Sequence, residues 1–218
     1  MQRIVFFDVE GTLVSNNTWR TLIKHPQLGR WRVRRAFVEG TLWWLLGRAR
    51  VIDDTRFRHL WVMAMARLFA GWDTARIRAL FTWVANNVDY RQDVVERLKQ
   101  HKRDGDQVVL VSGVFDEGVK AFAKHLGADE GLGTGLAYVN GLCVGRISGA
   151  SCAGERKLDF IQAYLRANGG AELSESYAYA DSYSDAAMLG AVGHPVATYP
   201  EDELRALALK RGWTVLGG

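Results

Sequence analysis

Polar side chains of two kinds follow three short apolar runs in this sequence, and their types suit the binding of a metal ion. Acidic residues come directly after the first and third runs, at Asp8 and Glu10 and again at Asp181 and Asp185. A hydroxyl, Ser112, follows the second run. If these groups converge, their oxygens form the kind of site that a hard divalent cation prefers.

Lys157 and the glycine at Gly113 extend this set toward phosphate chemistry. Lys157 stands at the start of a predicted helix and brings a positive charge to an otherwise acidic group. Phosphoryl transfer depends mainly on positioning and on neutralising charge with a metal ion, an ammonium group and backbone N–H donors. The combined set therefore predicts a metal-assisted reaction at a phosphate group.

A parallel sheet would bring these residues together, because ligands of such sheets collect outside the carboxyl ends of the strands. Short apolar runs of the kind found in buried strands occur at 4–7, 107–111, 177–180, 195–198 and 213–216. Helical patterns separate them at 93–103, 116–126, 156–167, 185–189 and 201–210. This alternation predicts an α/β protein, and Ser112 alone also fits the N-cap of the helix that follows it.

Two further segments interrupt the alternation. Residues 18–88 show helical spacing of apolar side chains without alternation, which indicates an all-helical insertion after the first strand. Residues 135–149 alternate around Asn140-Gly141, a strong signal for a β-hairpin.

Composition limits the class of protein. The chain has 218 residues, of which 48% are hydrophobic and 24% charged, and this excludes a disordered or low-complexity protein. Its two cysteines, Cys143 and Cys152, lack the spacing of a zinc site and are interpreted as packing residues in a reducing compartment. The apolar run at residues 4–7 is too short for a signal peptide. We therefore expect a cytoplasmic protein.

The basic residues are concentrated in the predicted insertion. Ten basic and three acidic residues lie between positions 15 and 60, within a chain of net charge +4. In one interpretation the arginines form a solvated face while the core of the insertion contains Trp43, Trp44, Leu45 and Leu46. In a second, arginines such as Arg20 and Arg56 point toward an anionic substrate. In a third, residues 30–35 belong to a basic amphipathic helix that contacts an anionic membrane or nucleic acid.

Four segments, in order along the chain, resemble the motifs of the haloacid-dehalogenase superfamily. They are 6–14, with Asp8-Val9-Glu10-Gly11-Thr12, then 109–113, 154–157 and 179–185. The length and place of the helical insertion are similar to the phosphoserine-phosphatase-like branch with a helical type 1 cap. The resemblance implies a three-layer α/β/α Rossmann-like core from residues 1–14 and 92–218, with a helical cap from residues 15–91.

The resemblance also implies a role for each motif residue. Asp8 would be the nucleophile that forms an aspartyl-phosphate, and Glu10 would be the general acid and base. Ser112, the Gly113 N–H and Lys157 would hold the phosphoryl oxygens. Mg²⁺ would be bound by Asp8, the Glu10 main-chain carbonyl, Asp181 and Asp185.

The implied function is a Mg²⁺-dependent phosphatase acting on a small phosphorylated metabolite, without nucleic acid or membrane partners. Glu10 departs from the family pattern, which has Asp at this position, and the extra methylene displaces its carboxyl group by about one ångström. Enolase-phosphatases of the superfamily carry Glu there. Two alternatives stay open: a catalytically weak or silent binding protein of the same fold, and a peripheral membrane- or nucleic-acid-associated protein that acts through its basic cap.

Overall fold

The structure is a computed structural model that describes residues 3–48, 54–170 and 172–217. Its centre is a sheet of six strands in the order β3-β2-β1-β6-β7-β8, in which each neighbouring pair is parallel. The strands are β1 (Ile4–Phe7), β2 (Gln107–Phe115), β3 (Glu130–Thr134), β6 (Tyr177–Ala180), β7 (His194–Thr198) and β8 (Thr214–Leu216). The predicted α/β class is confirmed.

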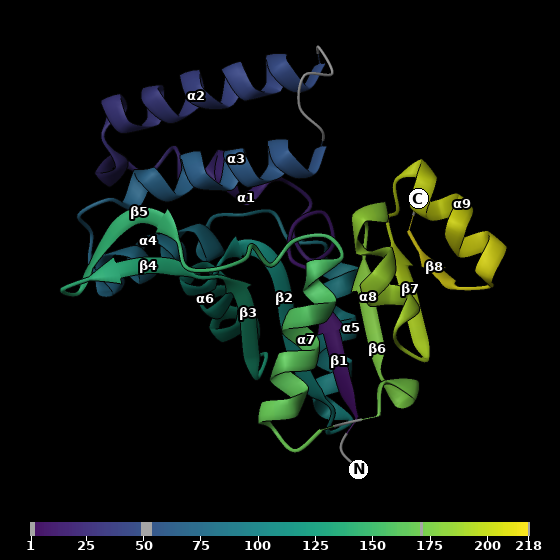
Figure 1. The fold of residues 1–218 in the computed structure, drawn as a ribbon. Coiled ribbons are helices and arrows are strands. Elements are labelled where there is room, and N and C mark those ends of the chain that lie inside the picture. Colours follow the sequence, from purple (N-terminus) through teal and green to yellow (C-terminus); the bar gives the residue numbers. More distant parts are fainter. Residues whose placement is uncertain (1–2, 49–53, 171, 218) are drawn as a thin grey trace.

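Helices cover both faces of this sheet and give three layers (Figure 1). Val5 and Phe7 of β1 face one apolar cluster, whereas Ile4 and Phe6 face the other, as the alternation of side chains along a strand requires. The first cluster includes residues of α5 (Gln92–Arg103) and α6 (Asp116–Leu126). The second includes residues of α7 (Arg156–Ala167), α8 (Ala186–Gly190) and α9 (Asp202–Arg211). Short 3₁₀ turns lie at Leu173–Glu175 and Tyr183–Asp185.

The segment between β1 and α5 is helical, as predicted. It contains α1 (Thr18–Leu22), α2 (Arg30–Arg48), α3 (Asp54–Ala66) and α4 (Thr74–Asn86), with 3₁₀ turns at Pro26–Leu28 and Arg67–Phe69. In Figure 1, α2 is the outermost of these helices and α3 lies between it and the rest of the molecule. The division into a core of 1–14 and 92–218 and a cap of 15–91 stays a prediction.

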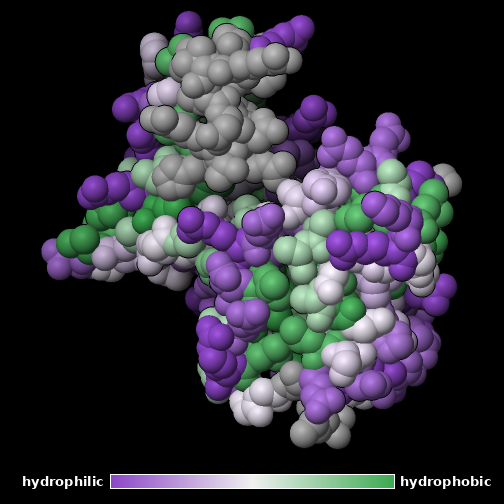
Figure 2. Space-filling model, turned by 45° about the vertical axis from the view of Figure 1, so that its right-hand side comes forward, coloured by the Kyte–Doolittle hydropathy of each residue, from purple (hydrophilic) through white to green (hydrophobic). Residues whose placement is uncertain are grey.

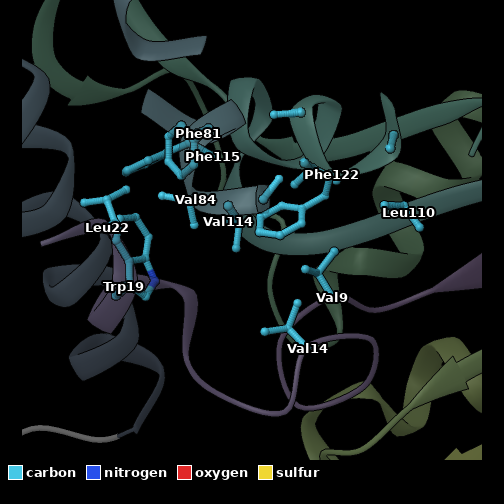
Figure 3. Packing of buried hydrophobic residues seen from close by; sticks show 14 of the residues in the cluster. Val9, Val14, Trp19, Leu22, Phe81, Val84, Leu110, Val114, Phe115 and Phe122 are labelled. Carbon is cyan, nitrogen blue, oxygen red and sulfur yellow. The ribbon is translucent and has the colours of Figure 1, made fainter. Parts of the chain in front are cut away.

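The inserted helices share their apolar interior with the sheet layer (Figure 3). The ring of Phe115, at the end of β2, makes edge contacts with Trp19 of α1 and with Phe69. A Cβ atom on Gly118 of α6 would lie 2.7 Å from the ring of Phe81 in α4, so only a glycine permits these two helices to pack so closely. The insertion is thus anchored to the sheet layer through α1 and α4.

The predicted hairpin is confirmed as β4 (Leu136–Val139) and β5 (Leu142–Ile147). Its turn residues, Asn140 and Gly141, both have the positive φ angles that a tight hairpin turn requires. Backbone hydrogen bonds of 2.8 Å join Cys143 of β5 to Gly71 and to Trp72. The hairpin is therefore bonded to the inserted segment rather than to the large sheet.

Two expectations differ from the structure, and one strand has no counterpart among the expected elements. Strand β2 continues to Phe115 and α6 begins at Asp116, so Ser112 lies within a strand and is not a helix N-cap. Strand β3 was not predicted. Leu45, interpreted as part of the insertion's core, is half-exposed because α2 packs against α3 through only one face.

Among the residues that the structure describes, no helix combines the length and the apolar character needed to cross a bilayer. On the side shown in Figure 2, hydrophobic surface appears in patches between hydrophilic side chains.

Candidate active site

Asp8 lies directly after β1, at the carboxyl end of the sheet. Its backbone N–H donates a 2.9 Å hydrogen bond to the carbonyl of Tyr179, which continues the pairing of β1 with β6. The side chain is buried, and its Oδ1 lies 2.8 Å from Nζ of Lys157. The sheet therefore fixes the carboxylate beside an ammonium group.

Lys157 reaches this position from the first turn of α7. Its Nζ is also 2.7 Å from Oδ2 of Asp185, so one buried ammonium group pairs with two buried carboxylates. Burial alone lowers the pKa of Lys157, but the charges of Asp185 and Asp8 outweigh burial and raise the pKa above its ordinary value. Lys157 is thus a fixed positive charge at neutral pH.

Asp181 enters the same group from the end of β6. Its Oδ1 accepts a 3.0 Å hydrogen bond from the hydroxyl of Thr12. A Cβ atom on Gly11 would lie 2.0 Å from Oδ2 of Asp181, and Gly11 has a φ of +79°. Only glycine meets both conditions, so Gly11 allows the loop after β1 to lie against the Asp181 carboxylate.

The charges at this end of the sheet do not balance. Burial raises the pKa of Asp8 to about 6, and the charge of Asp181 adds to this effect while Lys157 opposes it. Burial likewise raises the pKa of Asp181 to about 6, with a further contribution from Asp185. Three carboxylates thus face one ammonium group, and carboxylate oxygens in excess are suited to a divalent cation.

Lys157 lies between two of these carboxylates. Its Nζ bridges Asp8 and Asp185. Within the described part of the chain, no three His, Cys, Asp or Glu side chains stand in a ready-made metal-binding group. The carboxylate oxygens of Asp8, Asp181 and Asp185 are nevertheless of the chemical type that a divalent cation prefers.

Glu10 is held differently from the other acids. Its Oε1 accepts hydrogen bonds of 2.8 and 2.6 Å from the backbone N–H and the hydroxyl of Thr18, the first residue of α1. Burial raises the pKa of Glu10, and the hydrogen bonds from Thr18 oppose that shift. The carboxyl group of Glu10 thus links the loop after β1 to the inserted helix α1.

Ser112 and Gly113 lie on the neighbouring strand at the same edge. Phe7 pairs with Leu110 on the neighbouring strand, so Ser112 lies one residue beyond the position opposite Asp8. Ser112 is buried, and its Oγ is 3.4 Å from the N–H of Val114. The carbonyl of Gly113 accepts a 3.0 Å bond from Thr134, which links this segment to β3.

The loop before α7 lies beside Gly113 and is bonded to the end of β3. The hydroxyl of Thr134 accepts a 3.0 Å bond from the N–H of Cys152. Burial raises the pKa of the Cys152 thiol to about 12, so it remains a neutral packing group, as predicted.

Sequence reasoning missed residues that hold the acidic loops in place. The N–H of Glu201 donates a 3.0 Å bond to the carbonyl of Asp181, and its carboxylate accepts bonds from Ser182 and Tyr183. The hydroxyl of Thr18 donates a hydrogen bond to Glu10. Their signals were weak, because a Thr at the start of a helix and a Glu before one are common capping residues.

Not every residue considered from the sequence joins this group. Arg20 of α1 is exposed to solvent, and the side chain of Arg56 lies outside the described residues. The described geometry therefore gives no support to Arg20 as a substrate contact.

Comparison with known proteins identifies the family to which the chain belongs. Residues 5–190 match the family model for haloacid dehalogenase-like hydrolases. The chain belongs to this family and is a hydrolase, as predicted. It is 30% identical to a probable phosphatase of Mycobacterium tuberculosis, over 97% of this chain and 74% of that protein.

Two further likenesses agree with this placement. A phosphoserine phosphatase of the same organism is 36% identical over 120 residues, which cover 55% of this chain and 39% of the relative. A solved structure of a protein of unknown function from Bordetella pertussis Tohama I has the same fold, with a TM-score of 0.83. It is 24% identical, and the match covers 100% of this chain and 99% of the other.

Proposed function

We propose that this hydrolase is a Mg²⁺-dependent phosphatase that acts on small phosphate monoesters through an aspartyl-phosphate on Asp8. The observation that carries the proposal is the buried pairing of Lys157 with both Asp8 and Asp185, with Asp181 adding a further carboxylate to the same group. This is a negative site with one fixed positive charge, at the sheet edge where ligands collect.

In the first step a carboxylate oxygen of Asp8 attacks phosphorus. A bond from this oxygen to phosphorus forms, and the bond from phosphorus to the substrate's ester oxygen breaks. Glu10 gives its proton to the departing alkoxide, which leaves as an alcohol. The elevated pKa that burial gives Glu10 favours the protonated form needed for this transfer.

In the second step water attacks the phosphorus of the aspartyl-phosphate. The carboxylate of Glu10 takes a proton from this water, and the bond between phosphorus and Asp8 breaks. Inorganic phosphate leaves, and Asp8 and Glu10 return to their starting states. Thr18 orients Glu10 in both steps, because it bonds to the carboxyl group that transfers the proton.

The remaining residues position the phosphoryl group. Lys157, the Ser112 hydroxyl and the Gly113 N–H hold its oxygens. Mg²⁺ would be held by Asp8, the Glu10 main-chain carbonyl, Asp181 and Asp185, and the excess of carboxylates over ammonium groups supports this assignment. When bound, the ion offsets the negative charge of the phosphoryl group.

The substrate class follows from the same proposal. A small phosphorylated metabolite fits, and phosphoserine is the first candidate because the partial match to a phosphoserine phosphatase covers about half of the chain. Residues 15–91 would form the cap that selects the substrate, and the enzyme would work in the cytoplasm.

The test is a screen of phosphate monoesters, including phosphoserine, with wild type and Asp8→Asn in parallel. We expect Mg²⁺-dependent release of phosphate that chelation abolishes and that Asp8→Asn lacks. Binding of phosphate and Mg²⁺ without turnover of any ester would instead favour the catalytically silent binding protein.

A further inference from the structure

The outward face of α2 carries a stripe of exposed apolar side chains. Trp31, Val38, Leu42 and Leu45 are 81%, 63%, 51% and 52% exposed. The opposite face of α2 packs on α3, where a Cβ atom on Gly40 would lie 2.3 Å from the ring of Trp61. We call these four exposed residues the α2 stripe.

The α2 stripe is a continuous feature of the helix surface. Its residues are separated by seven, four and three positions, so they fall on one side of an α-helix. From Trp31 to Leu45 the stripe extends about 21 Å along the helix axis. Figure 1 places α2 at the outside of the inserted helices, with α3 between it and the sheet layer.

Arginines border the α2 stripe on both sides. In helical projection Arg35 lies to one side of it, and Arg34 and Arg30 lie to the other, and all three are exposed. The one acidic residue of the helix, Glu39, already pairs with Arg35 and Arg67. The surface is therefore apolar at its centre and positive at its margins.

A cavity of about 730 Å³ adjoins the first turns of α2. Its walls combine positive side chains, from Lys24, Arg30 and Arg34, with apolar ones that include Trp31 and Phe37. This combination suits an anionic group that is attached to an apolar body.

The α2 stripe and the three arginines that border it together form what we call the α2 face. We propose that the α2 face binds in the plane of an anionic lipid bilayer. The α2 stripe would enter the boundary between headgroups and acyl chains, while the long arginine side chains extend to the lipid phosphates. Each arginine near an anionic membrane surface adds a favourable electrostatic contribution. This inference favours the membrane alternative left open by the sequence over the expectation of no membrane partner.

Two other partners could be considered for the α2 face, a second copy of the chain and a nucleic acid, and both fit it less well than a bilayer does. A second copy docked through the same face would bring the arginines of both chains together, which is unfavourable. A nucleic acid would pair with the arginines but would leave the aliphatic Val38, Leu42 and Leu45 exposed to water. Only a surface that is negative outside and apolar beneath satisfies both parts of the α2 face.

The experiment is flotation of the full chain with vesicles of phosphatidylcholine alone or mixed with phosphatidylglycerol. We expect binding to the mixed vesicles that weakens as salt is raised, and little binding to phosphatidylcholine. The double variant Leu42→Ser/Leu45→Ser should bind mixed vesicles more than tenfold more weakly, because the stripe then has less apolar area to bury. Arg34→Gln/Arg35→Gln should weaken binding and reduce its salt dependence.

Matched controls come from exposed residues elsewhere. Leu209 of α9 is 70% exposed, and Arg78 and Arg166 are exposed on α4 and α7. Leu209→Ser and Arg78→Gln/Arg166→Gln should bind vesicles like wild type. A thermal melt of each variant verifies that it is folded.

Several outcomes would overturn the inference. They are absence of binding to the mixed vesicles, equal binding to phosphatidylcholine alone, and full binding by the folded Leu42→Ser/Leu45→Ser variant. A dimer that forms without lipid and is lost in that variant would assign the α2 face to self-association instead. Tighter binding of a polynucleotide that displaces the vesicles would assign it to nucleic acid.

Discussion

The two ends of the sheet each hold a buried carboxylate with the same exposed fraction, 5%, but their surroundings differ. At the amino end, Asp106 accepts two 2.8 Å hydrogen bonds from Arg3, and Nδ1 of His101 lies 2.7 Å away. At the carboxyl end, Asp8 pairs with Lys157, which it shares with Asp185. Both carboxylate oxygens of Asp106 have hydrogen-bond partners of their own, whereas Asp8 shares its ammonium partner with Asp185.

The pKa values of the two carboxyl groups shift in opposite directions as a result. Burial acts to raise the pKa of Asp106, but hydrogen bonds from Arg3 and His101 outweigh it and hold the pKa below its ordinary value. For Asp8, burial dominates and raises the pKa to about 6. The opposite shifts follow from two differences: Asp106 has Arg3 and His101 as partners, whereas Asp8 lies deeper in the protein and shares Lys157 with Asp185.

Replacing each carboxyl group by an amide gives the largest expected difference. Asp8→Asn should lower kcat by on the order of 10³-fold or more, because an amide cannot serve as the nucleophile. Asp106→Asn should retain the activity of wild type per folded molecule. Steady-state assays of both variants, with the best ester from the screen, measure this difference in kcat. Comparable losses of kcat in the two variants would contradict the proposed difference between the two ends of the sheet.

Removing the shared cation should be nearly as damaging. Lys157→Met leaves Asp8 and Asp185 buried without their ammonium partner, so we expect a loss of about 3–5 kcal/mol in unfolding free energy, measured without Mg²⁺. Activity should be lost as well. The control is Lys120→Met, which removes an exposed pair with Asp116 and should cost at most about 1 kcal/mol. Urea denaturation that gives similar costs for both lysines would contradict the account.

A pair of glycines tests the carboxyl end more finely. Gly11 and Gly105 have φ angles of +79° and +83°, but an added Cβ atom would meet the Asp181 carboxylate at Gly11 and no atom within 4 Å at Gly105. Gly11→Ala should lower kcat by roughly 10²-fold through displacement of the Asp181 carboxylate. Gly105→Ala should cost only about 1 kcal/mol of stability from backbone strain. If a folded Gly11→Ala variant kept the turnover and the Mg²⁺ requirement of wild type, the close approach of Asp181 to the loop after β1 would not be needed for activity.

The smallest effect concerns acid stability at the amino end. Because its folded-state pKa is below the unfolded value, Asp106 adds stability above about pH 4 that is lost as pH falls through the folded pKa. Asp106→Asn should lower the unfolding free energy by about 1–3 kcal/mol at pH 7. The difference from wild type should shrink toward pH 3 in denaturation series, and a constant difference would argue against this role.

Residues with strong local signals were predictable from the sequence. The apolar run before Asp8, the Asn140-Gly141 turn and the helix that places Lys157 follow from periodicity and turn chemistry, and the structure has all three. The resemblance of four segments to the family motifs also implied that Lys157 and Asp185 lie in one site with Asp8, and the ion pairs show all three together.

Features set by tertiary packing were not predictable. Strand β3 contains Gly131 and Gly133, which weaken any local strand signal. Both are needed because a Cβ atom at either would lie within 3 Å of the backbone of α6. The bond between Thr18 and Glu10 and the exposure of Leu45 likewise depend on how the inserted helices dock.

The most direct test of the account is exchange of oxygen between inorganic phosphate and water, because it requires no knowledge of the substrate. If Asp8 forms a covalent acyl phosphate reversibly, wild type with Mg²⁺ should replace ¹⁸O in labelled phosphate by solvent oxygen, which ³¹P NMR resolves. Asp8→Asn should show no exchange, while Asp106→Asn should exchange like wild type. Exchange in Asp8→Asn at the wild-type rate would contradict the central claim that Asp8 is the nucleophile.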